Sequence, residues 1–159
     1  MSAPDRATAA PVPDARPADG YAGDITPQQA WDLLQSAPGA VLVDVRTDAE
    51  WRFVGVPDLS STGREPVLTQ WVTVEGRPNP SFVTDLAAAG VTPETPVVFL
   101  CRSGQRSIGA ARAATAAGLG PSYNVLEGFE GAQDAQGART IDGWRNDGLP
   151  TTAYGEGAK

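Results

Sequence analysis

Cys101 is the residue with the clearest chemical potential, because it is the only cysteine of the chain. It opens a polar segment, residues 101–107, that reads CRSGQRS. An apolar run at 96–100 precedes this segment, and an alanine-rich stretch at 108–117 follows it. The order predicts a strand, a tight loop and a helix. The thiol would then lie at the carboxyl end of a strand and face a helix N-terminus.

Such a position favours negative charge, because loop amides and the helix dipole point toward it. Arg102 and Arg106 add two cations close in sequence. These conditions favour the thiolate, which is the nucleophilic form of cysteine. The alternative is a buried, inert cysteine, since free cysteine is among the most buried residue types. The polar loop with its glycine argues against that alternative, because a cysteine that only fills a core does not need it.

The composition excludes several kinds of chemistry. The 159 residues include no histidine, so a Cys–His dyad, a Ser–His triad and a histidine-containing metal site are all impossible. A single cysteine excludes an intramolecular disulfide and suits a reducing compartment, so we expect a cytoplasmic protein. The net charge of −7 argues against nucleic acid or an anionic membrane as a partner. No apolar run is long enough to span a bilayer, and we expect no metal and no cofactor.

The chain is predicted to hold one domain between two tails. Residues 1–20 are rich in alanine, proline and aspartate, and such a segment cannot bury enough apolar surface to become ordered. We predict a disordered tail over 1–20, a single domain over 21–151 and a flexible tail over 152–159. The N-terminal segment also lacks the apolar stretch of a secretory signal.

Apolar runs alternate with helical patterns along the domain. Thr26, Pro27 and Gln29 predict an N-cap and the first and third positions of a helix. Further helices are predicted at 48–53, 79–89 and 107–117, and strands at 41–43, 97–100 and 123–126. Residues 67–74 are predicted as a strand or a long ordered loop, and 128–143 as a solvated loop. The alternation predicts an α/β fold with a mostly parallel central sheet.

Ligands of such folds bind beyond the carboxyl ends of the strands. Asp44, Cys101 and Glu127 each come at or just after a predicted strand end. We therefore expect these three residues to converge on one edge of the sheet.

Four segments, in this order, resemble the motifs of the rhodanese family of sulfurtransferases. They are LVDVRTDAEW at 42–51, the cysteine loop at 101–107, VLEGFEG at 125–131, and Gly143-Trp144 with GLP at 148–150. The resemblance covers about residues 24–150. The segment 54–59, VGVPDL, departs from the family's Gly-His-Ile pattern because it has no histidine.

The resemblance implies a rhodanese-like fold, with helices on both faces of the sheet. It also implies a sulfurtransferase that moves sulfane sulfur from a donor such as thiosulfate to a thiol or cyanide through a persulfide on Cys101. A protein could serve as the acceptor. The residues expected to bind the substrate follow the cysteine: Arg102, Ser103, Gly104, Gln105, Arg106 and Ser107. In the matching upstream motif we expect Asp44 to fix the adjacent loop. Arg46 and Glu50, spaced i, i+4, are predicted to form a structural ion pair.

Two other functions stay open. Cysteine phosphatases and arsenate reductases use Cys-x5-Arg, but position 107 is serine and Arg106 comes one residue early. The shorter loop should be too tight for phosphate and better fitted to a sulfur atom. A protein-interaction or redox-sensing module of the same fold is the second alternative, although the retained cysteine favours an active domain.

Overall fold

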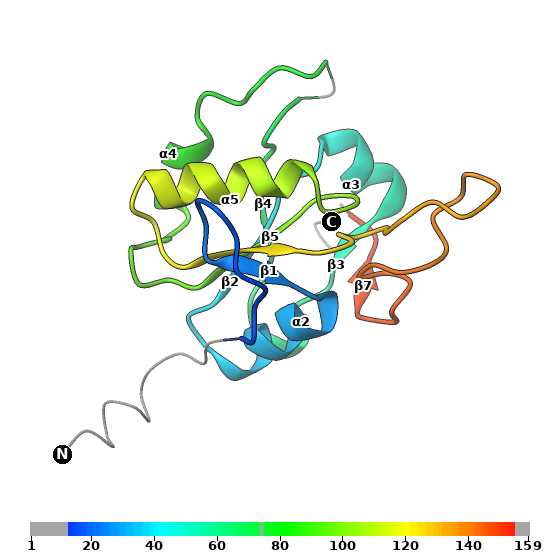
Figure 1. The fold of residues 1–159 in the computed structure, drawn as a ribbon, viewed down its shortest axis with the longest axis horizontal. Coiled ribbons are helices and arrows are strands. Elements are labelled where there is room, and N and C mark those ends of the chain that lie inside the picture. Colours follow the sequence, from blue (N-terminus) through cyan, green and yellow to red (C-terminus); the bar gives the residue numbers. More distant parts are fainter. Residues whose placement is uncertain (1–12, 74, 155–159) are drawn as a thin grey trace.

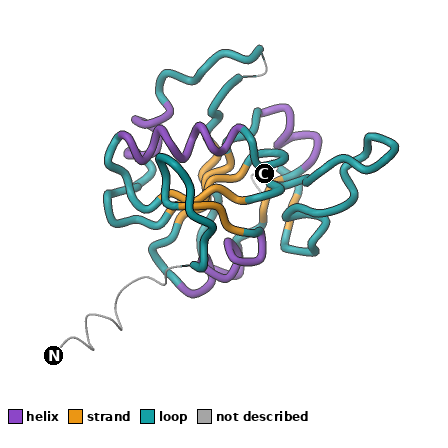
Figure 2. The backbone as a smooth tube through the Cα atoms, viewed as in Figure 1, coloured by secondary structure: helices purple, strands orange, loops and turns teal. Residues whose placement is uncertain are grey.

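A five-stranded sheet forms the centre of the computed structural model, which describes residues 13–73 and 75–154 (Figures 1 and 2). Its strands are β1 (Gly23–Ile25), β2 (Val41–Asp44), β4 (Val67–Leu68), β5 (Val97–Leu100) and β6 (Ser122–Val125). They lie in the order β1-β6-β5-β2-β4, and all neighbours are parallel. The predicted parallel sheet is therefore confirmed. A separate antiparallel pair joins β3 (Val56–Pro57) to β7 (Thr151–Thr152).

Helices cover both faces of the sheet, which confirms the predicted α/β fold. They are α2 (Pro27–Ser36), α3 (Asp48–Val54), α4 (Phe82–Ala88) and α5 (Arg106–Ala116), with a short 3₁₀ helix, η1, at Ser60–Thr62. Figure 1 shows α2 below the sheet and α4 with α5 above it. In the described part of the chain, no helix has the length and apolar character needed to cross a membrane.

The strand side chains alternate between two apolar layers. Leu42 and Val98 point into the layer that contains α2, whereas Val43 and Phe99 point into the layer that contains α4 and α5. Neighbouring side chains of a strand face opposite sides of a sheet, and here both sides are covered. The strands β2 and β5 therefore read as apolar runs, and this is why the sequence pattern located them.

Local hydrogen bonds set the helix ends. Thr26 caps α2 as predicted: its side chain accepts from the amide of Gln29, and the Gln29 side chain accepts from the amide of Thr26. Helix α4 starts later than predicted, at Phe82, because the Asn79 side chain accepts from the amide of Ser81 and forms a turn before the helix. Helix α5 begins at Arg106, immediately after the cysteine loop.

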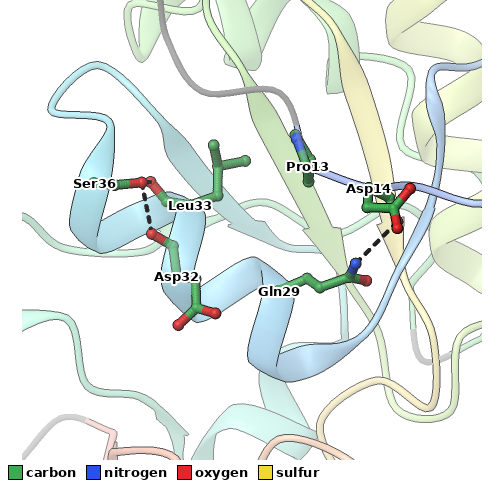
Figure 3. A pocket seen from close by; sticks show the side chains of 6 residues that line it. All are labelled: Pro13, Asp14, Gln29, Asp32, Leu33 and Ser36. Atoms are coloured by element: carbon green, nitrogen blue, oxygen red, sulfur yellow. Dashed lines mark hydrogen bonds between the residues drawn. The ribbon is translucent and has the colours of Figure 1, made fainter.

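The N-terminal segment is ordered further than the predicted tail boundary at residue 20. Arg16 forms an antiparallel bridge with Asp24 of β1, and the Gln29 side chain donates to the carbonyl of Asp14 at 2.9 Å. Figure 3 shows Pro13 and Asp14 beside α2, where they line a shallow cavity of about 220 Å³. The bridge at Arg16 and the side-chain bonds to the carbonyls of Asp14 and Asp19 hold this segment on the domain, and composition alone does not reveal such contacts. Residues 1–12 lie outside the described part, so the tail stays a prediction there.

Ordered structure also continues past residue 151. Thr152 belongs to β7 and pairs with Val56, and the Tyr154 ring lies 6.0 Å from the ring of Trp51. The predicted C-terminal tail is therefore placed against the domain as far as Tyr154. Residues 155–159 lie outside the described part of the chain.

The two long connections differ in form. After the two-residue strand β4, the chain leaves the sheet and is held by a bridge between Val72 and Pro78. The 128–143 segment is the projecting orange loop of Figure 1. Its hairpin is organised by Asp134, whose side chain accepts from the amides of Gln136 and Ala138 and from the Thr140 hydroxyl. The prediction of a solvated loop is confirmed for 132–142, most of which is exposed, but Gly128, Phe129 and Gly131 are buried against the domain.

Candidate active site

Cys101 follows β5 directly and is 1% exposed. Its Sγ atom accepts a hydrogen bond from the amide of Gly104 at 3.1 Å, and the Ser107 hydroxyl lies 3.1 Å from the same sulfur. An amide directed at the sulfur favours a negatively charged form. The loop thus encloses the thiol.

Gly104 makes this loop possible. Its φ angle is +95°, a left-handed conformation that side chains with a Cβ seldom adopt. A Cβ built on it would also lie 3.1 Å from the amide nitrogen of Glu127. The glycine therefore lets the loop turn sharply and lie against the chain that leaves β6.

The turn after β6 holds the cysteine loop from outside. The amide of Phe129 donates to the carbonyl of Cys101 at 2.8 Å, and the amides of Glu130 and Gly131 donate to the carbonyl of Arg102. Gly128 packs directly against the loop, because a Cβ on it would lie 2.4 Å from the Cys101 carbonyl oxygen. Residues 127–131 therefore form a backbone clasp around the start of the loop.

Glu127, which follows β6, has an unusual backbone conformation and a carboxyl group with a raised pKa. Its φ angle of +64° is the one positive value among the described residues that are not glycine. Burial raises the pKa of its carboxyl, and the nearby Asp142 and Asp147 raise it further. Glu127 thus lies beside the cysteine loop at the carboxyl edge of the sheet, and its backbone contacts Gly104.

Arg106, the last arginine of the loop, is held by a carboxylate. Its Nη1 and Nη2 atoms each donate to Glu50 at 2.9 Å. Burial disfavours the ionised Glu50, but the hydrogen bonds from Arg106 and Thr47 outweigh it and lower the pKa of the carboxyl to about 2. Glu50 also completes the cap of α3, because its Oε1 accepts from the amide of Thr47. The Thr-x-x-Glu spacing of this capping box is visible in the sequence and could have revealed this role of Glu50.

The predicted ion pair between Arg46 and Glu50 is wrong. Arg46 instead binds Asp44 through Nε and Nη2, at 2.9 and 2.7 Å, and both side chains are fully buried. The reason is that α3 begins only at Asp48, so Arg46 precedes the helix and the i, i+4 geometry does not apply. Its guanidinium lies 4.1 Å from the centroid of the Phe129 ring, so it connects the end of β2 to the clasp.

A polar network behind the cysteine was not predicted. The Ser107 hydroxyl donates to the Asn124 side-chain oxygen, and the Asn124 amide donates to Asp24 at 3.0 Å and to the carbonyl of Gly104 at 3.3 Å. Tyr21 donates to the same oxygen of Asp24 at 2.8 Å. Asn124 is fully buried within β6. The signal in the sequence is an amide side chain inside a predicted buried strand, because such a group needs a partner when buried.

The remaining loop residues point to different surroundings. Arg102 and Gln105 are exposed, whereas Ser103 is half-buried. Beside them is an open cavity of about 410 Å³. It is lined by residues of the loop, of α5, of β1 and β6 and of the segment after β6: Asp24, Ser103, Gly104, Gln105, Ile108, Asn124, Leu126, Glu127 and Ala132. Within the described ranges, no three acidic or cysteine side chains are grouped as metal ligands.

Trp71 has a structural place. Its ring packs edge-on against Phe82 at 5.1 Å, and a Cβ on Gly109 of α5 would lie 2.9 Å from its indole nitrogen. Trp71 therefore packs between Phe82 of α4 and Gly109 of α5.

The family model of the rhodanese-like domain matches residues 26–135. The chain belongs to the family of rhodanese-like domain proteins. A crystal structure of Rv0390 from M. tuberculosis is 58% identical, with 84% of this chain and 98% of that chain covered and a TM-score of 0.77. The polysulfide-sulfur transferase of Wolinella succinogenes is 25% identical, with coverage of 83% and 79% and a TM-score of 0.56. RC0915 of Rickettsia conorii, an uncharacterized protein, is 36% identical over 128 residues, which are 80% of this chain and 94% of that protein.

Proposed function

We propose that this rhodanese-like domain protein is a sulfurtransferase that carries sulfane sulfur as a persulfide on Cys101. The observation that carries the proposal is the amide of Gly104, which donates to Sγ from inside a tight Cys-x4-Arg loop. Such a cradle of backbone donors stabilises an anionic sulfur more than a neutral one. The polysulfide-sulfur transferase among the structural relatives supports the same reaction class.

The reaction with thiosulfate balances without a cofactor. The Cys101 thiolate attacks the outer sulfur, the sulfur–sulfur bond of thiosulfate breaks, and sulfite leaves with the bonding electron pair. The product is an anionic persulfide on Cys101. Cyanide or a thiolate then attacks the terminal sulfur, and Cys101 leaves as the thiolate that began the cycle. Thiosulfate and cyanide are the proposed laboratory substrates, and a small thiol or a protein thiol is the proposed acceptor. Because the resting cysteine must stay reduced, we place this activity in a reducing compartment such as the cytoplasm.

The two arginines take different parts in this proposal. Arg102 is exposed and is proposed to attract and hold the sulfonate end of an anionic donor. Arg106 is engaged by Glu50 through both Nη atoms and is proposed to position the loop and favour its negative charge. This engagement also argues against the phosphatase alternative, in which the corresponding arginine must grip a phosphate.

Intact-mass measurement after incubation with thiosulfate tests the proposal. We expect the protein to gain the mass of one sulfur atom and to lose it when cyanide is added. Cys101→Ser should remain folded, with an unchanged thermal unfolding midpoint, and gain no sulfur. Sulfur uptake by Cys101→Ser would disprove the assignment of the nucleophile. Hydrolysis of p-nitrophenyl phosphate without any sulfur uptake would favour a phosphatase, and neither activity would favour an interaction module.

A further inference from the structure

The network behind Cys101 has a fixed hydrogen-bond direction, set by the side-chain amide of Asn124. The Asn124 nitrogen faces the carbonyl of Gly104 and a carboxylate oxygen of Asp24. A carbonyl oxygen can only accept a hydrogen bond, and the same is true of an ionised carboxylate. The nitrogen must therefore point toward these two atoms, which leaves the Asn124 oxygen facing Ser107.

The orientation of Asn124 in turn fixes the hydroxyl proton of Ser107. The Asn124 oxygen can only accept, so the single hydroxyl proton of Ser107 is directed at Asn124. Ser107 keeps only lone pairs for the sulfur of Cys101, which lies 3.1 Å away. A neutral thiol fits this contact, because its S–H can donate to the serine oxygen. A thiolate does not, and neither does a persulfide, because Sγ carries no proton in either form.

We propose that Asn124 is a positioning residue that holds Ser107 as an acceptor toward Cys101 and thereby favours the thiol in the resting protein. To stabilise a thiolate or a persulfide, Ser107 must turn its proton from Asn124 to the sulfur. That turn leaves the buried oxygen of Asn124 without a donor, which opposes the change. The role of Asn124 in sulfur transfer rests on the function proposed above, whereas its effect on the thiol does not.

Some groups around Cys101 favour its thiolate form, and others favour the thiol. Arg106 of α5 interacts electrostatically with the sulfur and favours the anion. The same guanidinium also interacts with the carboxylates of Glu50 in α3 and Asp44 at the end of β2. Asp24 of β1 lies behind Asn124, and Glu127 follows β6. The loop amide and Arg106 therefore favour the thiolate, and the Asn124–Ser107 pair opposes them.

The thiolate content of the protein, measured by ultraviolet absorbance against pH, tests the proposal without any sulfur donor. Because Cys101 is the only cysteine, the difference from Cys101→Ser reports this thiol alone. Asn124→Leu keeps the branched shape but removes the acceptor, so the Ser107 proton becomes free to bind the anion. We expect the thiolate-to-thiol ratio at neutral pH to rise about tenfold, the effect of roughly one hydrogen bond to a charged group.

A double-mutant comparison separates this effect from a general loss of structure. In a Ser107→Ala background, Asn124→Leu should no longer change the ratio, because the effect acts through the serine. Asn124→Asp keeps an acceptor toward Ser107 but loses the donor to Gly104, so it should not raise the ratio. Ser122→Ala, which removes another side-chain hydrogen bond of β6, is the matched control and should leave the ratio unchanged.

Three results would overturn the proposal. One is an unchanged ratio in a folded Asn124→Leu protein, and another is a rise that persists when Ser107 is alanine. The third comes from Ser107→Ala alone and decides the matter even if Asn124→Leu does not fold. A clear fall of the ratio in that variant would mean that the serine already donates to the thiolate. Failure of sulfur uptake would contradict the proposed function but would not alter these titrations.

Discussion

Glu50 serves two structural purposes with one carboxylate. It closes the capping box of α3 through Thr47, and it holds Arg106 at the end of the cysteine loop. The two roles support each other, because the helix fixes the carboxylate in the orientation in which both Nη atoms of the arginine can reach it. The Glu50 side chain is 19% exposed, so this pair is screened by water less than a surface ion pair.

Substitution of Glu50 by glutamine should make stability less dependent on acid pH. The folded-state pKa of about 2 lies below the ordinary 4.5, so the stabilisation is complete above pH 4.5 and is lost as the pH falls toward 2. At neutral pH we expect Glu50→Gln to lower the free energy of unfolding by roughly 1–3 kcal/mol, and the difference to shrink below pH 4.5. Urea denaturation at several pH values measures both, with Glu65→Gln at an exposed position as control. A gap that widens in acid would contradict the assignment.

At the scale of elements, two parallel strands place the cysteine loop and the clasp at the same edge of the sheet. Strand β5 ends immediately before the cysteine loop, and β6 ends before the clasp at 127–131. The clasp binds the loop through main-chain hydrogen bonds from Phe129, Glu130 and Gly131. The shape of the loop therefore depends on backbone fit between two elements as much as on its own side chains.

Gly128→Ala should disrupt this fit. The new Cβ would lie 2.4 Å from the Cys101 carbonyl oxygen, so the loop must move. Gly137→Ala is a matched control, because its φ of +84° is also left-handed but no atom lies within 4 Å of the added Cβ. We expect Gly137→Ala to cost about 1–2 kcal/mol of stability and to leave sulfur uptake unchanged. Gly128→Ala should cost more and slow sulfur uptake from thiosulfate at least about tenfold, as expected when reacting groups are misplaced. Equal uptake rates in the two variants would show that the clasp does not shape the loop.

At the scale of the whole molecule, the sheet is closed at the β1 edge by the segment that enters the domain. Arg16 and Asp24 exchange two main-chain hydrogen bonds, of 2.8 and 2.9 Å, so part of β1 has a partner on its free side. An unpaired strand edge is open to pairing with another chain. Residues 13–20 therefore belong to the folded unit in a structural sense, although their composition resembles a tail.

Arg16→Pro tests this closure. Proline has no amide proton, so the bond from Arg16 to the carbonyl of Asp24 cannot form. We expect the free energy of unfolding to fall by about 1 kcal/mol, together with a lower thermal midpoint. Arg16→Ala keeps the main-chain bond and should change stability little. If both variants unfold at the same temperature as the unaltered protein, the bridge contributes nothing to stability.

Much of the fold was predictable from local pattern. The strands around Leu42 and Phe99 were located because a parallel strand covered on both faces is mostly apolar. Thr26 and Pro27 predicted the start of α2 because a helix start requires partners for its free amides. The order of the cysteine segment predicted strand, loop and helix around Cys101 for the same local reasons. The small β3–β7 pair was not predicted, because its two-residue strands are too short to carry a pattern.

The partners of the polar side chains were decided only by the tertiary structure. The sequence offered Arg46 as the partner of Glu50, four residues away, but the carboxylate binds Arg106, which comes 56 residues later. In the same way, Asn124 of β6 meets Ser107 of α5 and Asp24 of β1. Hydrophobic periodicity records which side of an element is buried, because burial repeats along the chain. It contains no information on which buried donor meets which acceptor, since that depends on how distant elements pack together.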